Sequence, residues 1–108
     1  MGTQTIIISS VKKAHTYLES AIGLIGKKTP YSLFLQTRFG IHTFGLRFPI
    51  DVIILDKNHQ VVALKENLLS NRLFFWNPRY DHVLEMPAGI IKQSKIRKGS
   101  VVRLRLQD

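Results

Sequence analysis

The chain has 108 residues and a formal net charge of +9, from 16 lysines and arginines against 7 aspartates and glutamates. A chain of this length fits one domain, so we expect residues 1–108 to form a single domain with one core. It contains no cysteine, which excludes disulfide frameworks, cysteine-ligated zinc sites and thiol nucleophiles. The apolar fraction of 44% argues against a disordered chain, and the sequence has no apolar run that could span a membrane.

The first residues carry no recognisable targeting signal. They lack the basic start, the apolar segment and the small-residue cleavage site of a secretory signal peptide. Ile6 also occupies the position at which N-myristoylation requires Ser or Thr. We therefore expect a cytoplasmic protein.

The N-terminal part predicts one strand followed by one helix. The β-branched run Thr5–Ser9 is typical of a strand. From Ser10 onward, apolar side chains recur every three or four residues, which predicts an amphipathic helix. Its start lies at either Ser10 or Thr16, because Thr16 and Glu19 have the spacing of a capping box. Gly23 and a second glycine shortly after it end the helix.

The chain after Pro30 is mostly extended. Two strand-like runs, 50–55 and 61–65, flank the polar segment Asp56–Gln60, which predicts a β-hairpin. The segment Phe74–Trp76 is either an edge strand or an aromatic loop. Other short strands are expected at 32–35, 41–45 and 82–86, a helical turn at 90–95, and a last strand at the C-terminal end.

Alternation along the last strand predicts which side chains face the core. We expect inward-facing Val102, Leu104 and Leu106, and outward-facing Val101, Arg103 and Arg105. The whole pattern has six or seven short strands and one amphipathic helix near the N-terminus. It predicts an α+β, β-rich fold whose small sheet is strongly curved or barrel-like, because curvature leaves few open edges.

Three sequence blocks resemble a prokaryotic family catalogued as domain of unknown function number 192. The blocks are Gly23–Lys28, His42–Lys57, and Val83–Gly89 followed by Ile96-x-Lys98-Gly99. They occur in the family's order and span about residues 18–103. The family has no established biochemical activity, so the resemblance implies a compact β-rich domain and no particular reaction.

The sequence departs from the family pattern at three places. Ile25 and Leu46 stand where the family commonly has methionine. The segment Phe74–Asp81 lacks the cysteine that relatives often carry there. A thiol-based role is therefore not transferable to this chain.

Four side chains of the family-like blocks form a candidate acid–base pocket. His42, Arg47 and Asp51 lie within ten residues of one another, and Glu85 lies in the last block. A histidine, an arginine and two carboxylates could combine proton transfer with anion binding. Alternatively, Asp51 accepts hydrogen bonds from backbone groups in a turn, and Arg47 pairs with Asp51 or Glu85 for structural reasons.

A metal site is not expected. The four histidines show neither a His-x-His pair nor a helical i, i+4 pair. His82 and Glu85 are three residues apart on a predicted strand and point to opposite faces. We expect no bound metal and no cofactor.

Basic residues indicate an anionic partner, with nucleic acid the first choice. Six of them lie in the last eighteen residues, opposed only by Asp108, and such clusters attract polyanions. A second basic segment contains aromatic rings that could stack on bases. The candidate binding residues are Arg72, Trp76, Arg79, Lys95, Arg97, Lys98, Arg103 and Arg105.

Three functional interpretations remain open from the sequence. The first is a small binding module for an anionic partner. The second is a small enzyme or ligand-binding protein that uses His42, Arg47, Asp51 and Glu85. The third is an adaptor that binds a protein through the aromatic residues of segment 72–80. The basic C-terminal end could also serve only solubility, and the sequence decides neither catalysis nor oligomeric state.

Overall fold

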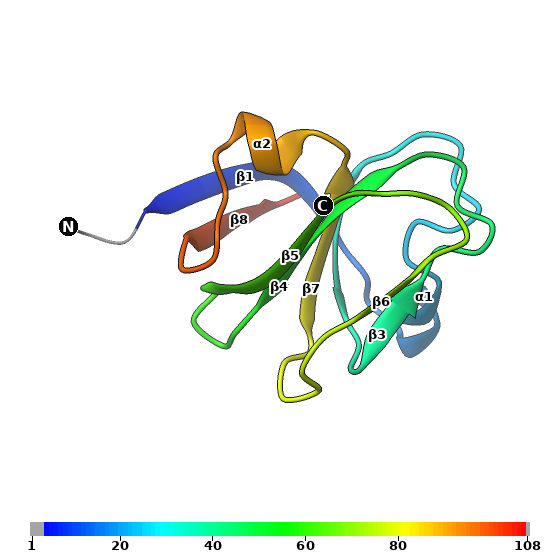
Figure 1. The fold of residues 1–108 in the computed structure, drawn as a ribbon, viewed down its shortest axis with the longest axis horizontal. Helices are drawn as coiled ribbons and strands as arrows, with labels where there is room; N and C mark the ends of the chain where they lie inside the picture. The colour runs from blue at the N-terminus through cyan, green and yellow to red at the C-terminus, as the bar shows by residue number, and fades with distance from the viewer. Residues whose placement is uncertain (1–3, 108) are drawn as a thin grey trace.

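The computed structural model describes residues 4–107, which form a six-stranded sheet, a two-stranded sheet and two short helices (Figure 1). The strand order in the large sheet is β5-β4-β7-β2-β1-β8, and β3 pairs with β6. The elements are β1 (Thr5–Lys13), α1 (Tyr17–Ile22), β2 (Ser32–Gln36), β3 (Gly40–His42), β4 (Ile50–Leu55), β5 (Val61–Leu68), β6 (Leu73–Phe75), β7 (His82–Pro87), α2 (Ile90–Gln93) and β8 (Val101–Leu106).

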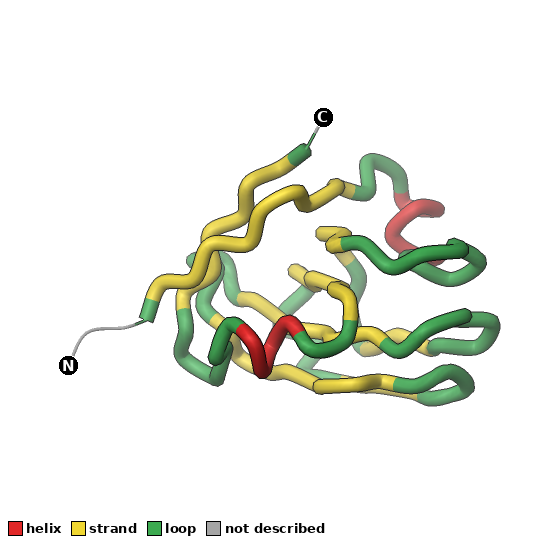
Figure 2. The backbone as a smooth tube through the Cα atoms, turned by 90° about the horizontal axis from the view of Figure 1, so that it is seen from above, coloured by secondary structure: helices red, strands yellow, loops and turns green. Residues whose placement is uncertain are grey.

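The large sheet is curled into a half-barrel, so the expectation of a strongly curved β-rich sheet is confirmed (Figure 2). Strand β1 runs parallel to β2 and β8, and the other neighbours are antiparallel. The two edges of the sheet meet at one end. Val61 donates its backbone N–H to Ser100 at 2.8 Å, and Val102 donates to His59 at 2.8 Å. These bonds satisfy edge groups that would otherwise be open for pairing.

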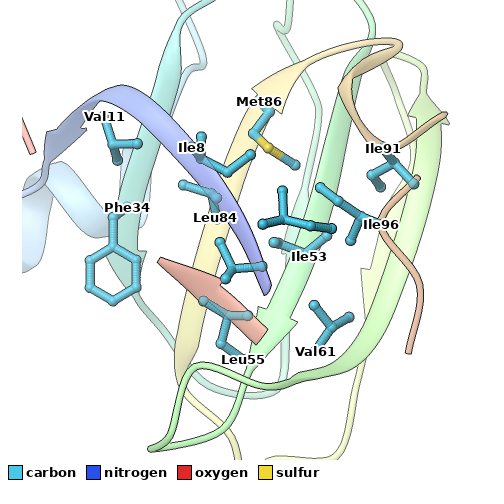
Figure 3. Packing of buried hydrophobic residues seen from close by; sticks show 12 residues of the cluster. Ile8, Val11, Phe34, Ile53, Leu55, Val61, Leu84, Met86, Ile91 and Ile96 are labelled. Atoms are coloured by element: carbon cyan, nitrogen blue, oxygen red, sulfur yellow. The ribbon is translucent and has the colours of Figure 1, made fainter. Parts of the chain in front are cut away.

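The concave face of the sheet encloses one hydrophobic cluster (Figure 3). The segment that contains α2 covers this face, and its side chains Ile91 and Ile96 face the strands. Burial of each large aliphatic side chain contributes about 1.5–3 kcal/mol to folding. The buried members are Ile6, Ile8, Val11, Phe34, Ile53, Leu55, Val61, Leu84, Met86, Ile91, Ile96 and Val102.

A second cluster covers the convex face, so the central strands are buried on both sides. All six residues of β4 are buried, which explains why 50–55 is an apolar run interrupted only by Asp51. This face is covered by Leu24 from the segment after α1, by Leu46 from the segment after β3, and by side chains from the region of β6. From β6, Phe74 packs against the cluster while Leu73 and Phe75 face outward. The buried members are Leu24, Leu33, Leu35, Leu46, Ile50, Val52, Ile54, Leu68 and Val83.

The expected long N-terminal helix is wrong in its first part. Strand β1 continues to Lys13, and α1 has only six residues. Its start follows the Thr16 alternative, because the Thr16 hydroxyl accepts a hydrogen bond from the Glu19 N–H at 3.0 Å. The apolar spacing that predicted the longer helix begins at Val11, which is a buried residue of β1 and follows a register shift after Ile8.

Other element predictions are confirmed with adjusted bounds. The 50–55 and 61–65 hairpin is present as β4 and β5, and the helical turn near 90 is α2. The segment 73–75 is a strand, and the strand expected at 41–45 is shorter, as β3. In β8, Val102 is buried, but Leu106 is 54% exposed rather than inward-facing, because it is the last residue of an edge strand, which has a neighbouring strand on one side only.

None of the helices in the described part of the chain is long and apolar enough to cross a membrane.

Candidate functional site

A buried carboxylate on β7 is the chemically most distinctive group of the fold. Glu85 is only 5% exposed, and its Oε1 accepts a hydrogen bond from the backbone N–H of Leu24 at 3.1 Å. The carboxylate reaches this amide because residue 23 is a glycine. A Cβ at Gly23 would lie 2.6 Å from Oε1 of Glu85, and Gly23 also has a positive φ of 57°.

Burial shifts the protonation equilibrium of this group. Loss of hydration raises the pKa of Glu85 from 4.5 to about 7, and the hydrogen bond from Leu24 opposes the shift only in part. The carboxyl group therefore exchanges between its neutral and charged forms near neutral pH. Ionisable groups of this kind occur often at binding and catalytic sites.

Glu85 lies in the wall of an apolar cleft of about 400 Å³. The cleft lies between the C-terminal half of α1, the segment from Thr37 through β3, and the outer side of β6. Four apolar side chains of the cleft are strongly exposed, from Ile22 at 42% to Phe75 at 66%. The lining residues are Ser20, Ala21, Ile22, Gly23, Thr37, Phe39, Gly40, Ile41, His42, Leu73, Phe75 and Glu85.

The hydrogen bond of Glu85 uses one of its two carboxylate oxygens. No described residue donates a hydrogen bond to Oε2. Every side-chain oxygen that is fully enclosed within residues 4–107 has a hydrogen-bond partner, so an unpaired Oε2 cannot be fully enclosed. Oε2 therefore has access to the cleft, where a ligand or water can reach it.

Of the four residues in the candidate acid–base pocket, the structure brings only His42 and Glu85 to this cleft. The His42 ring stacks on Phe44 with centroids 5.3 Å apart, and its Nδ1 accepts the Phe44 N–H at 3.3 Å. This arrangement leaves Nε2 of the neutral ring as the nitrogen that carries hydrogen.

Arg47 and Asp51 lie outside the cleft. Asp51 is fully buried and accepts three backbone hydrogen bonds, from Asn67 at 2.9 Å, Gly89 at 3.0 Å and Ile91 at 2.8 Å. Its carboxylate is thus occupied by structural bonds. Arg47 is exposed and makes no ion pair within residues 4–107.

A second hollow, of about 450 Å³, lies where the two edges of the large sheet meet. Lys57, Asn58 and His59 form one side of it, and Val101 to Leu104 of β8 form the other. Lys57 and Arg103 therefore flank the same groove, which we call the basic groove. Lys57 was not among the sequence candidates, because only the meeting of the sheet edges brings the β4–β5 turn to β8.

The sequence candidates for anion binding divide into two groups in space. Lys95, Arg97, Lys98, Arg103 and Arg105 are exposed along the segment from α2 through β8. The other group, Arg72, Trp76 and Arg79, belongs to the region of β6. Figure 1 shows β8 and β6 on different sides of the molecule.

The aromatic segment 72–80 does not form one continuous exposed surface. Trp76 is half-buried, and its Nε1 donates to the carbonyl of Tyr80 at 2.8 Å. The guanidinium of Arg72 donates to the nearby carbonyls of Ser70 and Asn71. Phe75 is the exposed ring of this segment, and it faces the Glu85 cleft.

Acidic side chains neutralise little of the basic surface. Within residues 4–107, the ion pairs are Arg38 with Asp81 at 3.3 Å and His82 with the same aspartate. Asp51 and Glu85 are buried. In the described part of the chain, no three histidine or acidic side chains cluster closely enough to hold a metal ion.

Comparison with known proteins places the sequence in a family. The model of the DUF192 family, described as "Uncharacterized ACR", matches residues 2–104. The chain belongs to this family. No curated protein matches the DUF192 chain.

Two solved structures share the fold of this DUF192 protein. One is a protein of unknown function from Novosphingobium aromaticivorans, with a TM-score of 0.70 and 17% identity, over 84% of this chain and 70% of the other. The second, from Sinorhizobium meliloti, is described as a "putative transcription regulator". It has a TM-score of 0.67 and 15% identity, over 86% of this chain and 76% of the other.

Proposed function

We propose that this DUF192 protein is a binding module for an anionic partner and that this partner is a nucleic acid. The basic groove would hold the phosphate backbone of the nucleic acid. The observation that carries the proposal is the position of Lys57 and Arg103 on one groove, with no ion pair to either within residues 4–107. Unpaired cations around a groove suit a phosphate backbone, because binding releases condensed counterions.

The distribution of charge supports the same proposal. The chain has 16 basic and 7 acidic residues, and two of the acidic side chains, Asp51 and Glu85, are buried. The exterior is therefore more basic than the net charge of +9 suggests. Such a field raises the rate at which a polyanion meets the surface. The description of the Sinorhizobium meliloti structure as a "putative transcription regulator" agrees with a nucleic-acid partner.

Fluorescence anisotropy with labelled single- and double-stranded oligonucleotides, titrated across salt concentrations, tests the proposal. We expect binding that weakens log-linearly with salt, with a slope set by the number of phosphates contacted. The double variant Lys57→Ala/Arg103→Ala removes the two groove cations. It should weaken binding, and it should lower the magnitude of the salt slope by about two, or one for each lost phosphate contact.

The double variant Lys28→Ala/Lys65→Ala is the matched control. It removes the same charge from two exposed positions outside the groove, and we expect a smaller loss of affinity. Equal losses in both variants would indicate a diffuse charge effect without a site. Absence of binding to every oligonucleotide at low salt would overturn the proposal and leave the basic side chains a role in solubility.

The second candidate function is ligand binding at the Glu85 cleft. The cleft supports binding more than catalysis. Among the described residues, no hydroxyl is hydrogen-bonded to His42 or to Glu85, so no activated nucleophile is present. Arg47 and Asp51, which the enzyme interpretation requires, do not line it.

A further inference from the structure

We propose that the Glu85 cleft is a site for a small apolar compound that carries a protonated amine, with the ammonium group against Oε2 of Glu85 and the apolar body between Phe39, Leu73 and Phe75. This site is separate from the basic groove, since the two share no lining residue. The proposal therefore does not depend on nucleic-acid binding.

The carboxylate sets the chemistry of the ligand head. Glu85 is 5% exposed, and one of its oxygens has no donor among the described residues. A buried carboxylate is stabilised most by a positive charge or by several strong donors. The cleft itself supplies no lysine or arginine. A ligand with an ammonium group would supply the missing partner.

The walls set the chemistry of the ligand body. Ile22, Phe39, Leu73 and Phe75 are each 42–66% exposed at the cleft, although small proteins usually cover large apolar groups. The Phe75 ring lies directly over Gly40, where an added Cβ would be 2.5 Å from Cδ1 of that ring. A flat or linear apolar body fits between such walls and would remove these side chains from water.

Phe39 gives independent support for an occupant. Its backbone has a φ of 74°, a left-handed conformation that is unfavourable for a bulky residue. The ring is 65% exposed, so burial within the described chain does little to offset this conformation. Contact with a bound apolar group would give the ring the burial that it lacks.

Other ionisable groups near Glu85 are few. His42 is the other titratable side chain of the cleft. Glu19, Lys27 and Tyr31 border the adjoining hollow behind Ile22 and Gly23. The strands on either side of β7 place Leu33 and Val52 opposite Glu85. Among residues 4–107, Glu85 is therefore the acid that lines the cleft itself and can attract a cation into it.

Titration of the isotope-labelled protein with matched amines and alcohols, followed by amide NMR, tests the site. The probes are hexylamine, 2-phenylethylamine and tryptamine, each compared with the alcohol of the same body. We expect at least one amine to shift the amide signals of Leu24 and Gly40 and to bind about tenfold more tightly than its alcohol at about pH 8. Near pH 5.5, where the Glu85 carboxyl is neutral, the preference should fall to about twofold or less.

Three variants separate the role of the carboxylate from that of the cleft walls. Glu85→Gln keeps an oxygen for the Leu24 N–H and removes the charge, so it should abolish the amine preference while alcohol binding persists. Leu73→Ala should weaken the amine and the alcohol alike. Leu106→Ala is its control, because Leu106 is similarly exposed, at 54% against 57%, and lies outside the cleft.

Three outcomes would overturn the proposal: no shift with any of the three amines at millimolar concentration, equal binding of amine and alcohol at both pH values, or shifts that map outside the cleft. The comparison of the two pH values uses the unmodified protein. It therefore still tests the titratable groups of the cleft if the Glu85→Gln variant does not fold, and the His42→Gln variant, measured at the same two pH values, removes the group other than Glu85.

Discussion

The carboxylate of Asp51 accepts the backbone N–H of Ile91 at 2.8 Å and so ties the central strand β4 to helix α2, forty residues away in the chain. The same oxygen, Oδ2, also accepts a hydrogen bond from the backbone N–H of Gly89. The other oxygen, Oδ1, accepts one from the backbone N–H of Asn67 at the bulge of β5. One buried side chain therefore holds the segment that closes the concave core. It also satisfies three backbone amides, among them that of the buried residue Ile91.

Asp51→Asn should lower the free energy of unfolding by about 3 kcal/mol, because either orientation of the amide directs its NH₂ group at one or more of the three backbone donors. Urea unfolding at constant pH measures the loss. Asp56→Asn is the control, because both hydrogen bonds to the Asp56 carboxylate end on the same oxygen. Oδ1 accepts the backbone N–H groups of Asn58 and Gln60 at 2.8 and 2.9 Å. An asparagine keeps that acceptor, so the expected loss is below about 1 kcal/mol. Equal losses would contradict the bracing role of Asp51.

Glu85 should make stability depend on pH. Its pKa is about 7 in the folded protein, against 4.5 without burial. Between these values the folded state binds more protons than the unfolded state, so the free energy of unfolding falls as pH rises from 4.5 to 7. The contribution of Glu85 to this fall is about 3 kcal/mol.

The Glu85→Gln variant isolates this contribution from that of other groups. Urea unfolding should give similar stability for both proteins near pH 4.5, and higher stability for the variant above about pH 7.5, because only the parent must bury a charge. Parallel pH profiles for the two proteins would show that burial of Glu85 has no such effect.

Gly23→Ala should destabilise the fold through a collision with the carboxylate. The new Cβ would lie 2.6 Å from Oε1 of Glu85, and the backbone is already left-handed. We expect a loss of about 2–3 kcal/mol in thermal or urea unfolding. Gly26→Ala also places a side chain at a positive φ, of 82°, but has open space around the Cβ. Its loss should stay near 1 kcal/mol, and a larger loss there than at Gly23 would refute the close contact.

Phe39→Gly should keep or raise stability, by up to about 1 kcal/mol, because glycine adopts a positive φ without strain and the lost ring is largely exposed. Phe75→Gly is the comparison, since Phe75 is exposed to the same degree, at 66%, but lies in the regular strand β6. It should lose about 1 kcal/mol. Differential scanning calorimetry of both variants measures the contrast, and a lower Tm for Phe39→Gly than for Phe75→Gly would contradict it.

Local sequence patterns were sufficient for most strands, because side-chain alternation and turn residues act over a few positions. The hairpin of β4 and β5 is an example: two apolar runs flank the polar segment Asp56–Gln60, and the pairing follows directly. The helix was misplaced for a related reason. Val11, Ala14 and Leu18 recur at helical spacing, but Val11 belongs to β1 and Leu18 is 67% exposed.

The residue types for function were visible in the sequence, but their grouping was not. Glu85 and His42 were both candidates, and nothing near either of them indicates that Gly23, Phe39 and Phe75 share their cleft. In the same way, Arg103 was a candidate for anion binding from the sequence. Lys57 is a candidate only because the two edges of the folded sheet lie together. Propensity and periodicity depend on neighbours in the chain. The two sites depend on contacts such as Leu24 with Glu85, 61 residues apart, and these form only when the curled sheet brings distant segments together.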